Sequence, residues 1–182
     1  MILEEKTAKT KDGRSFVMRS ARKEDAEVLI NYLKKAAEET PFLIREPEEI
    51  TITLEQETAF INAIEESDRN LMLVAFIDGK HVGNCSISAI GNHKRYRHRC
   101  EIAIALLQKF WGLGIGRQMF EEALRVAKEL GYEQVELEVH ADNHKAIAMY
   151  KSFGFAIYGT RKKDMKFQDG TYADGHMMVK YF

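Results

Sequence analysis

Apolar and polar residues alternate along two early stretches of the chain. Residues 15–20 (SFVMRS) follow a turn-forming segment at 11–14 and alternate as a β-strand does. Residues 71–77 form a nearly continuous apolar run, and Asp78-Gly79 joins this run to a second strand-like segment at 81–90. The pattern predicts one strand near the start of the chain and a β-hairpin in its middle.

Apolar residues spaced three or four apart mark three longer segments as helices. The first runs from 23 to 39 and stops before Pro41, the second opens at Thr53, and the third begins at Gly114 and stops at Gly131. The apolar residues of the third helix share one face: Met119, Phe120, Ala123, Leu124, Ala127 and Leu130. These helices therefore have a face to bury against a sheet.

The remaining pattern predicts a strand at 99–107, a strand around 135–139, a short helix at 143–152, and strands at 155–164 and 176–182. The strand, helix and strand between 99 and 140 require a parallel crossover connection. We therefore expect an α/β fold, with a mixed, mostly antiparallel sheet that contains one parallel splayed strand pair and has helices on both faces.

Composition favours one globular domain over residues 1–182, with 45% hydrophobic and 30% charged residues. The 27 basic and 28 acidic residues nearly cancel, so no overall field attracts nucleic acid or a membrane surface. No apolar run approaches the ~20 residues that a membrane-spanning helix needs. We expect a cytoplasmic protein without a metal site, and we interpret Cys85 and Cys100 as reduced thiols.

The most distinctive chemical feature is a glycine-rich loop, WGLGIGR, at residues 111–117, between a predicted strand and the longest predicted helix. Glycines allow the backbone to turn sharply and allow its N–H groups to approach an anion at the positive end of the helix dipole. A diphosphate is the natural ligand of such a loop. By itself the loop also fits a dinucleotide-binding fold or a simple tight turn.

A second motif makes the assignment more specific. Residues 143–155 (NHKAIAMYKSFGF) follow about thirty residues later and resemble the motif N-x-x-A-I-x-x-Y-x-x-x-G-F of the GNAT superfamily of N-acetyltransferases. Residues 19–26 are similar to the opening strand and helix of that family. The resemblance implies acetyl-CoA as co-substrate and direct attack, in a ternary complex, by a primary amine of a small molecule or a protein N-terminus.

The resemblance also implies which residues bind the cofactor. In the family the strand before the glycine loop splays from its neighbour at a bulge, and the pantetheine arm pairs with its main chain. By motif position, the cofactor-binding residues are Ile104, Ala105, Leu106, Gly112, Leu113, Gly114, Ile115, Gly116, Arg117 and Asn143. A main-chain N–H at or beside Leu106 would stabilise the oxyanion. Arg117 is either a cationic contact or a solvated helix residue, and Trp111 replaces the usual Gln or Arg.

Acyl transfer to an amine needs a proton donor for the departing thiolate and an acceptor for the proton of the amine. Tyr150 matches the general acid of the family, although it also fits a core tyrosine. We take Glu138 as the candidate base, with Glu101, His140 and water as the alternatives. Glu101 lies one residue out of register with the family's carboxylate, which would turn it to the opposite face unless a bulge compensates.

The acceptor is less defined by sequence. Residues 38–66 contain nine Glu and one Arg, either an acidic rim for a cationic amine or the solvated faces of two helices. The apolar cluster at 41–44 either lines an acceptor pocket or seals the end of the sheet. The basic segment 93–99 is either an RNA contact or a solvated turn, and we expect no nucleic-acid partner.

Two further possibilities concern function and assembly. The apolar ending at 177–182 is compatible with a homodimer formed through the last strands. A non-catalytic acyl-CoA-binding sensor or assembly module is the alternative to an enzyme, because such a module would keep the phosphate-binding loop. The intact Tyr150 favours catalysis.

Overall fold

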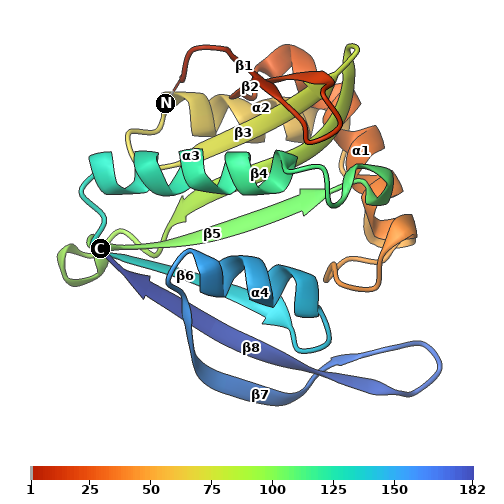
Figure 1. Ribbon diagram of the computed structural model, residues 1–182, viewed down its shortest axis with the longest axis vertical. Coiled ribbons are helices and arrows are strands. Elements are labelled where there is room, and N and C mark those ends of the chain that lie inside the picture. The colour runs from red at the N-terminus through yellow and green to blue at the C-terminus, as the bar shows by residue number, and fades with distance from the viewer. Residues whose placement is uncertain (1) are drawn as a thin grey trace.

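The computed structural model describes residues 2–182, and their strands form one open sheet (Figure 1). The eight strands are β1 (Lys6–Lys9), β2 (Ser15–Ser20), β3 (Leu71–Ile77), β4 (Lys80–Ala89), β5 (Arg99–Leu106), β6 (Gln134–His140), β7 (Ala156–Lys166) and β8 (Tyr172–Tyr181). Their order in the sheet is β1-β2-β3-β4-β5-β6-β8-β7, and all neighbours are antiparallel except β5 and β6. The mixed, mostly antiparallel sheet that the sequence predicts is confirmed.

The α-helices cover both faces of the sheet. They are α1 (Ala26–Glu39), α2 (Leu54–Glu66), α3 (Ile115–Glu129) and α4 (His144–Ser152), and in Figure 1 α3 and α4 lie in front of the sheet while α1 and α2 lie behind it. Strand β3 is buried on both sides, which explains its continuous apolar sequence. Leu73 packs in the larger core with Phe120 of α3, whereas Val74 packs with Leu29 of α1.

Local side-chain contacts fix the starts of the first two helices. Arg19, at the end of β2, donates two hydrogen bonds of 2.7 and 2.8 Å to Asp25, which also accepts the N–H of Arg22 just before α1. Thr53 and Gln56 form a reciprocal capping box at the start of α2. The helix starts read from the sequence therefore have a direct structural cause.

The parallel pairing of β5 with β6 is short. It runs only from Arg99 opposite Gln134 to Glu101 opposite Glu136, after which the two strands diverge (Figure 1). The family resemblance predicts a bulge in β5 where it splays. Strand β5 instead stays in continuous register with β4 as far as Leu106, so this pairing contains no bulge. The strands separate because β5 follows β4 while β6 follows β8 along its whole length.

Strand β1 was not predicted from the sequence, and the last two strands extend beyond their predicted ends. The segment Lys6–Lys9 reads KTAK and pairs with β2 from Lys6 opposite Met18 to Lys9 opposite Ser15. It has no apolar alternation for a sequence pattern to detect. Contacts with distant segments, described below, hold it in place.

Strand β4 carries a buried histidine, His81. A ring nitrogen of His81, Nε2, lies 2.9 Å from the carbonyl oxygen of Gly83, and its ring packs against Tyr32 with the centroids 4.3 Å apart. Burial lowers the pKa of His81 to about 4, while the charges of Asp25 and Arg19 act in opposite directions. His81 is therefore neutral in the folded protein at neutral pH.

We expect His81 to make stability depend on pH. In the unfolded chain it takes up a proton near its ordinary pKa of 6.5, whereas the folded chain resists protonation down to about 4. Stability should therefore fall as the pH drops through this interval, by up to about 3 kcal/mol. Thermal unfolding of His81→Gln should show a shallower pH dependence than the wild type, and His93→Gln, at an exposed position, should leave it unchanged. Parallel curves for His81→Gln and wild type would contradict this assignment.

Candidate active site

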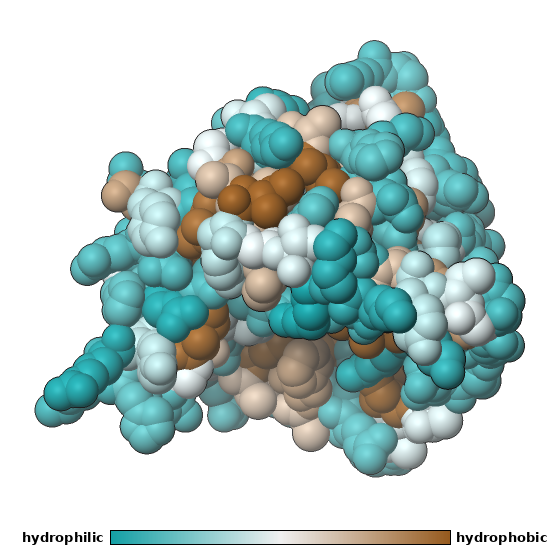
Figure 2. Space-filling view, turned by 90° about the horizontal axis from the view of Figure 1, so that it is seen from below, coloured by the Kyte–Doolittle hydropathy of each residue, from teal (hydrophilic) through white to brown (hydrophobic). Residues whose placement is uncertain are grey.

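The divergence of β5 and β6 opens a cavity of about 1360 Å³. It is lined by β5, the glycine loop, the end of β6, the first turns of α4, the last turns of α1 with the loop that follows, and part of β7. The volume exceeds the roughly 300–1,000 Å³ that is usual for small-molecule pockets, so a long ligand and a second molecule fit together. Seen from below, the molecule is hollowed between hydrophilic rims, and less polar residues lie inside the hollow (Figure 2).

The glycine loop presents its main chain to this cavity. Gly114 has a φ of 85°, in the left-handed region, and begins α3 without a capping side chain. The first helical bond of α3 runs from the N–H of Gln118 to the carbonyl of Gly114, so the N–H groups of residues 115–117 have no partner within residues 2–182. A Cβ at Gly116 would lie 3.1 Å from Leu106 Cδ1, so only glycine lets the helix approach β5 without displacing that side chain. This arrangement suits a phosphate group.

The predicted loop residues contribute in two different ways. The glycines Gly112, Gly114 and Gly116 and the side chain of Arg117 line the cavity. Ile115 is fully buried in the core and Leu113 packs against it, so these two residues can offer only main-chain groups. Arg117 donates a hydrogen bond of 2.8 Å to Ser152 Oγ.

Strand β5 presents an open edge beside the loop. The N–H of Leu107 donates to the carbonyl of Val82 on β4 at 3.0 Å. Because main-chain groups of alternate residues point to opposite sides of a strand, those of Leu106 and Ile104 point away from β4, toward the gap that β6 has left. Ala105, between them, points back toward β4. An extended ligand can therefore pair with β5 as an added strand.

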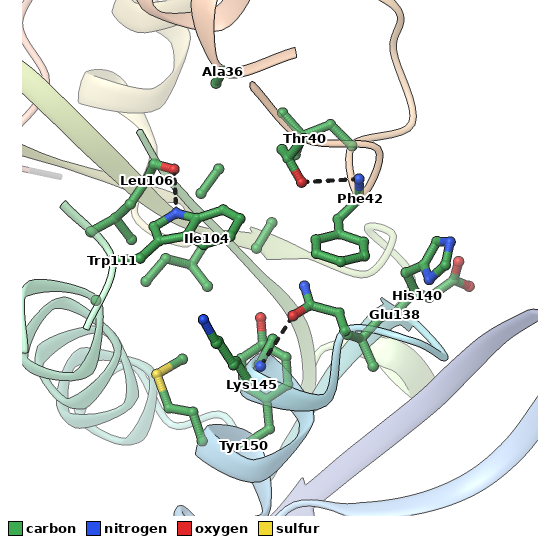
Figure 3. A pocket seen from close by; sticks show the side chains of 18 of the residues that line it. Ala36, Thr40, Phe42, Ile104, Leu106, Trp111, Glu138, His140, Lys145 and Tyr150 are labelled. Carbon is green, nitrogen blue, oxygen red and sulfur yellow. Dashed lines mark hydrogen bonds between the residues drawn. The ribbon is translucent and has the colours of Figure 1, made fainter. Parts of the chain in front are cut away.

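Two aromatic side chains hydrogen-bond main-chain carbonyls near the end of β5. The indole Nε1 of Trp111 donates a hydrogen bond of 2.8 Å to the carbonyl of Leu106 (Figure 3), and the hydroxyl of Tyr32 donates one of 2.6 Å to the carbonyl of Ala105. The peptide unit whose N–H belongs to Leu106 is thus held through its carbonyl by Tyr32. Trp111 stands where the family has a polar residue and hydrogen-bonds the protein itself. No pattern in the sequence indicates the role of Tyr32.

Tyr150 lies on α4 at the boundary between the core and the cavity. Its ring packs against Phe120, with centroids 5.1 Å apart, and against Phe155, while the residue also lines the cavity (Figure 3). Its hydroxyl makes no hydrogen bond among the described residues. Burial raises the pKa of Tyr150 above its ordinary value, so the phenol keeps its proton at neutral pH and can donate it.

Asn143 begins α4. Its side-chain oxygen accepts the N–H of Ala146 at 3.2 Å, which confirms the capping expected from the sequence. Its amide nitrogen has no partner within the described part of the chain, and the residue lines the cavity. The donor groups of the amide are thus free for a ligand.

Two carboxylates share one face of the sheet inside the cavity. Glu101 lies opposite Glu136 on β6, and Glu138, two residues further along β6, points to the same side. Arg161 donates to both oxygens of Glu138, at 2.9 and 3.2 Å. Glu101 makes no hydrogen bond or ion pair among residues 2–182, and burial, followed by the charges of Glu138 and Glu136, raises its pKa.

His140, the other candidate base, is buried at the end of β6. Its Nδ1 accepts the N–H of Asp142 at 3.2 Å, so the neutral ring carries its proton on Nε2. That Nε2 has no partner among the described residues, and the ring packs 5.1 Å from Phe42 and 6.1 Å from Phe167. The lone pair of Nδ1 is thus used by the main chain at Asp142.

The loop that follows α1 contributes apolar side chains to the cavity and is bridged to the β7–β8 hairpin. Phe42, Leu43 and Ile44 line the cavity, consistent with the pocket interpretation of this cluster. Gln168, in the turn between β7 and β8, donates hydrogen bonds of 2.5 and 3.1 Å to Glu46 and Glu48 in the loop between α1 and α2. The loop and the hairpin are thereby joined beside the cavity.

The charged side chains that stand out in the sequence lie mostly outside the cavity. None of the nine Glu residues in 38–66 and none of residues 93–98 lines the cavity. Arg99 is paired with Glu136 at 2.6 Å. Within residues 2–182 there is no cluster of side chains able to hold a metal ion, and no helix long and apolar enough to cross a membrane.

Comparison with known proteins agrees with this geometry. The model of the acetyltransferase (GNAT) family matches residues 27–155. The chain is 32% identical over 109 residues to the L-amino acid N-acetyltransferase AaaT of Escherichia coli. The matched region covers 59% of this chain and 66% of AaaT, just under two thirds of that relative. The chain therefore belongs to the acetyltransferase (GNAT) family.

Solved structures share the whole fold. The acetyltransferase of the GNAT family from Streptococcus pneumoniae has a TM-score of 0.87 at 30% identity, over 92% of this chain and 99% of that one. The yncA protein from Salmonella typhimurium, solved with its cofactor acetyl-CoA, has a TM-score of 0.79, over 91% of this chain and 93% of that one. The second similarity, at 19% identity, shows the fold alone.

We expect Trp111→Phe to weaken the end of β5. The substitution keeps an aromatic ring but removes the hydrogen bond to the Leu106 carbonyl, at a cost of about 1 kcal/mol in the free energy of unfolding. Urea unfolding followed by circular dichroism measures this loss, since Trp111 is the only tryptophan and fluorescence is lost with it. Tyr96→Phe, at an exposed ring, is the control and should be neutral. Equal stability of Trp111→Phe and wild type would contradict the role given to this bond.

Proposed function

We propose that this protein is an N-acetyltransferase that moves the acetyl group of acetyl-CoA to a primary amine of a small molecule or a protein N-terminus. One observation gives the proposal its main support. A single cavity contains an uncapped helix start, an open strand edge and a tyrosine whose hydroxyl has no partner within the described residues. These are the groups needed to bind a phosphate, to align an extended arm and to protonate a leaving thiolate.

The residues present fit acetyl-CoA along the length of the cavity. The main-chain N–H groups of 112–117 bind the diphosphate, and those of Ile104 and Leu106 pair with the pantetheine arm, with the Asn143 amide as a further donor. This binding uses main-chain groups almost entirely. The thioester would then lie near the end of β5, where the N–H of Leu106 and the hydroxyl of Tyr150 could act on it.

The reaction requires one bond to form and one to break. The neutral amine nitrogen attacks the acetyl carbon, the carbon–sulfur bond breaks, and the N–H of Leu106 stabilises the negative charge on the acetyl oxygen meanwhile. Tyr150 donates its proton to the departing sulfur. The proton released by the amine reaches a carboxylate and then, through water, returns to Tyr150, so the protons balance over one cycle.

Glu138 remains our candidate for the group that takes the proton of the amine, and Glu101 is the alternative. Glu138 lies on the wall of the cavity, but Arg161 binds both of its oxygens. Glu101 has no such partner, and its raised pKa increases its affinity for a proton. The two carboxylates also favour an ammonium group over an anionic one at this end of the cavity.

The lining of the cavity supports an acceptor with an apolar group next to its amine. Phe42, Leu43 and Ile44 provide apolar surface on one side, and Glu101 and Glu138 provide negative charge on the other. AaaT is named for acetylating L-amino acids, which fits an amine of this kind. A protein N-terminus with an apolar first residue has the same local chemistry.

The alternative is a non-catalytic acyl-CoA-binding sensor or assembly module. It would need the phosphate-binding loop and the strand edge but neither Tyr150 nor the two carboxylates. The free hydroxyl of Tyr150 therefore favours the enzyme, and turnover separates the two functions.

Replacement of Tyr150 by Phe tests the enzyme directly. We expect kcat to fall by about 10²- to 10³-fold, since a general acid is lost, while the KM for acetyl-CoA changes little because the ring still packs in the core. Release of the free thiol from acetyl-CoA in an amine panel provides the rate.

Tyr158→Phe, at an exposed tyrosine outside the cavity, is the matched control and should retain full activity. The single Trp111 lies in the cavity, so its fluorescence reports CoA binding independently of turnover. CoA binding without turnover of any amine would establish the sensor instead.

The two carboxylates can be distinguished by the pH dependence of kcat/KM. If Glu138 is the base, Glu138→Gln should lower kcat/KM about 10²-fold, whereas Glu101→Gln should have a smaller effect. Glu138→Gln also removes a negative charge that raises the pKa of Glu101, so any remaining acid limb due to Glu101 should move to lower pH. The reverse ranking of the two variants would make Glu101 the base.

A further inference from the structure

The unpredicted N-terminal hairpin reaches the glycine loop. The turn between β1 and β2 lies against the start of α3, where the N–H of Lys11 donates a hydrogen bond of 2.9 Å to the carbonyl of Leu113. One turn into the helix, Gln118 Nε2 donates a bond of 3.0 Å to the carbonyl of Lys9. Two segments more than a hundred residues apart in sequence are joined at the phosphate-binding loop.

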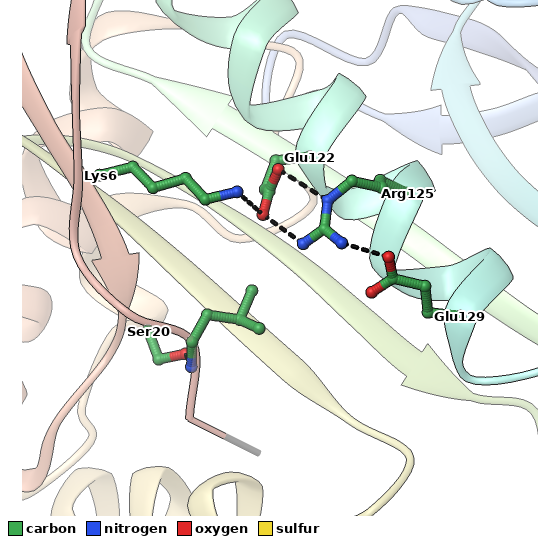
Figure 4. Close-up of polar contacts among 6 residues, drawn as sticks. Lys6, Ser20, Glu122, Arg125 and Glu129 are labelled. Atoms are coloured by element: carbon green, nitrogen blue, oxygen red, sulfur yellow. Dashed lines mark hydrogen bonds and ion pairs between the residues drawn. The ribbon is translucent and has the colours of Figure 1, made fainter.

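An ion pair anchors the other end of β1 to the same helix. Lys6 lies 2.7 Å from Glu122, which also pairs with Arg125 at 2.7 Å, and Arg125 binds Glu129 as well (Figure 4). Hydrogen bonds from Arg125 and Lys6 lower the pKa of Glu122 to about 2, so this carboxylate stays ionised at neutral pH. Gln118 and Glu122 are four residues apart on α3, so β1 follows one face of the helix.

The turn between β1 and β2 contains three charged side chains, and one of them, Lys11, has no ion pair among the described residues. Arg14 pairs with Asp12 at 2.7 Å, so these two charges neutralise each other. The N–H of Thr10 bonds the carbonyl of Arg14 at 2.9 Å and closes the turn. Lys11 lacks such a pair within residues 2–182, although its N–H is bonded to the carbonyl of Leu113.

The side chain of Lys11 lines the cavity beside the phosphate-binding loop. A Cβ at Gly114 would lie 3.5 Å from Lys11 Cγ and 3.7 Å from its Cε, so the lysine stem passes directly by that glycine. The ammonium group therefore lies within reach of any anion held by the loop. Arg117, the other cation in the loop region, is held by Ser152 and stacks 4.6 Å over Phe153.

We propose that Lys11 is a cofactor-binding residue whose ammonium group binds the diphosphate of acetyl-CoA. The proposal rests on the proposed function, because it requires acetyl-CoA in the cavity. A flexible lysine acts on phosphate as a point charge, which complements the fixed main-chain N–H groups of the loop. Strand β1 then has a function: it holds the turn so that Lys11 faces the loop.

The test measures binding through Trp111 fluorescence with three probes: CoA, 3′-dephospho-CoA, and pantetheine, which lacks all the phosphates. Lys11→Gln should weaken the binding of CoA and of 3′-dephospho-CoA by about tenfold and leave pantetheine binding unchanged. Lys11→Arg should retain most of the affinity. The deficit of Lys11→Gln should shrink in high salt, because a screened charge contributes less.

Lys9→Gln is the matched control, since Lys9 lies on the same hairpin but its ammonium group binds Ser15 outside the cavity. It should bind all three probes as the wild type does. CoA binding by Lys11→Gln at wild-type affinity would overturn the proposal, as would an equal loss for pantetheine. A deficit seen with CoA but absent with 3′-dephospho-CoA would overturn the diphosphate assignment. Failure of the wild type to bind CoA would instead reject the proposed function itself.

Discussion

The short parallel pairing of β5 and β6 is the constraint on which the rest of the site depends. Each strand is committed to another neighbour, β5 to β4 and β6 to β8, and the two halves of the sheet separate after Glu101 and Glu136. Separation leaves main-chain groups of β5 without a strand to bond, which is costly in a protein interior unless water or a ligand satisfies them. The cavity and its chief binding surface thus have one origin, the divergence of the sheet.

The side chains around this edge chiefly hold the main chain of β5 in position. Tyr32 and Trp111 hold the carbonyls of Ala105 and Leu106, which fixes the strand where it lacks a partner. The absence of a side chain at Gly116 lets α3 begin close beside it. Burial raises the pKa of both titratable groups: it keeps Tyr150 protonated and increases the affinity of Glu101 for a proton.

The sequence was most informative where structure follows from local pattern. Short-range periodicity and motifs predict the order of the main elements, the parallel crossover and the glycine loop. The structure confirms the element order and the crossover. It places the glycine loop in the cavity. Strand β1 was not predicted because its sequence, KTAK, has no apolar periodicity. Its position involves an ion pair between Lys6 and Glu122, which are 116 residues apart. Tyr32 was missed for a similar reason, since its hydroxyl meets Ala105 only in the folded chain. The roles of the site residues remain predictions.

The bridge from Gln168 to Glu46 and Glu48 connects two surface segments that are distant in sequence, and neither belongs to the cofactor-binding part of the cavity. Exposed side-chain bonds of this kind contribute little to overall stability, so their loss is easily tolerated. Substitutions in the hairpin turn or in the loop can therefore alter this rim of the molecule while β5 and the glycine loop keep their own contacts. The two ends of the cavity are thus free to vary independently of each other.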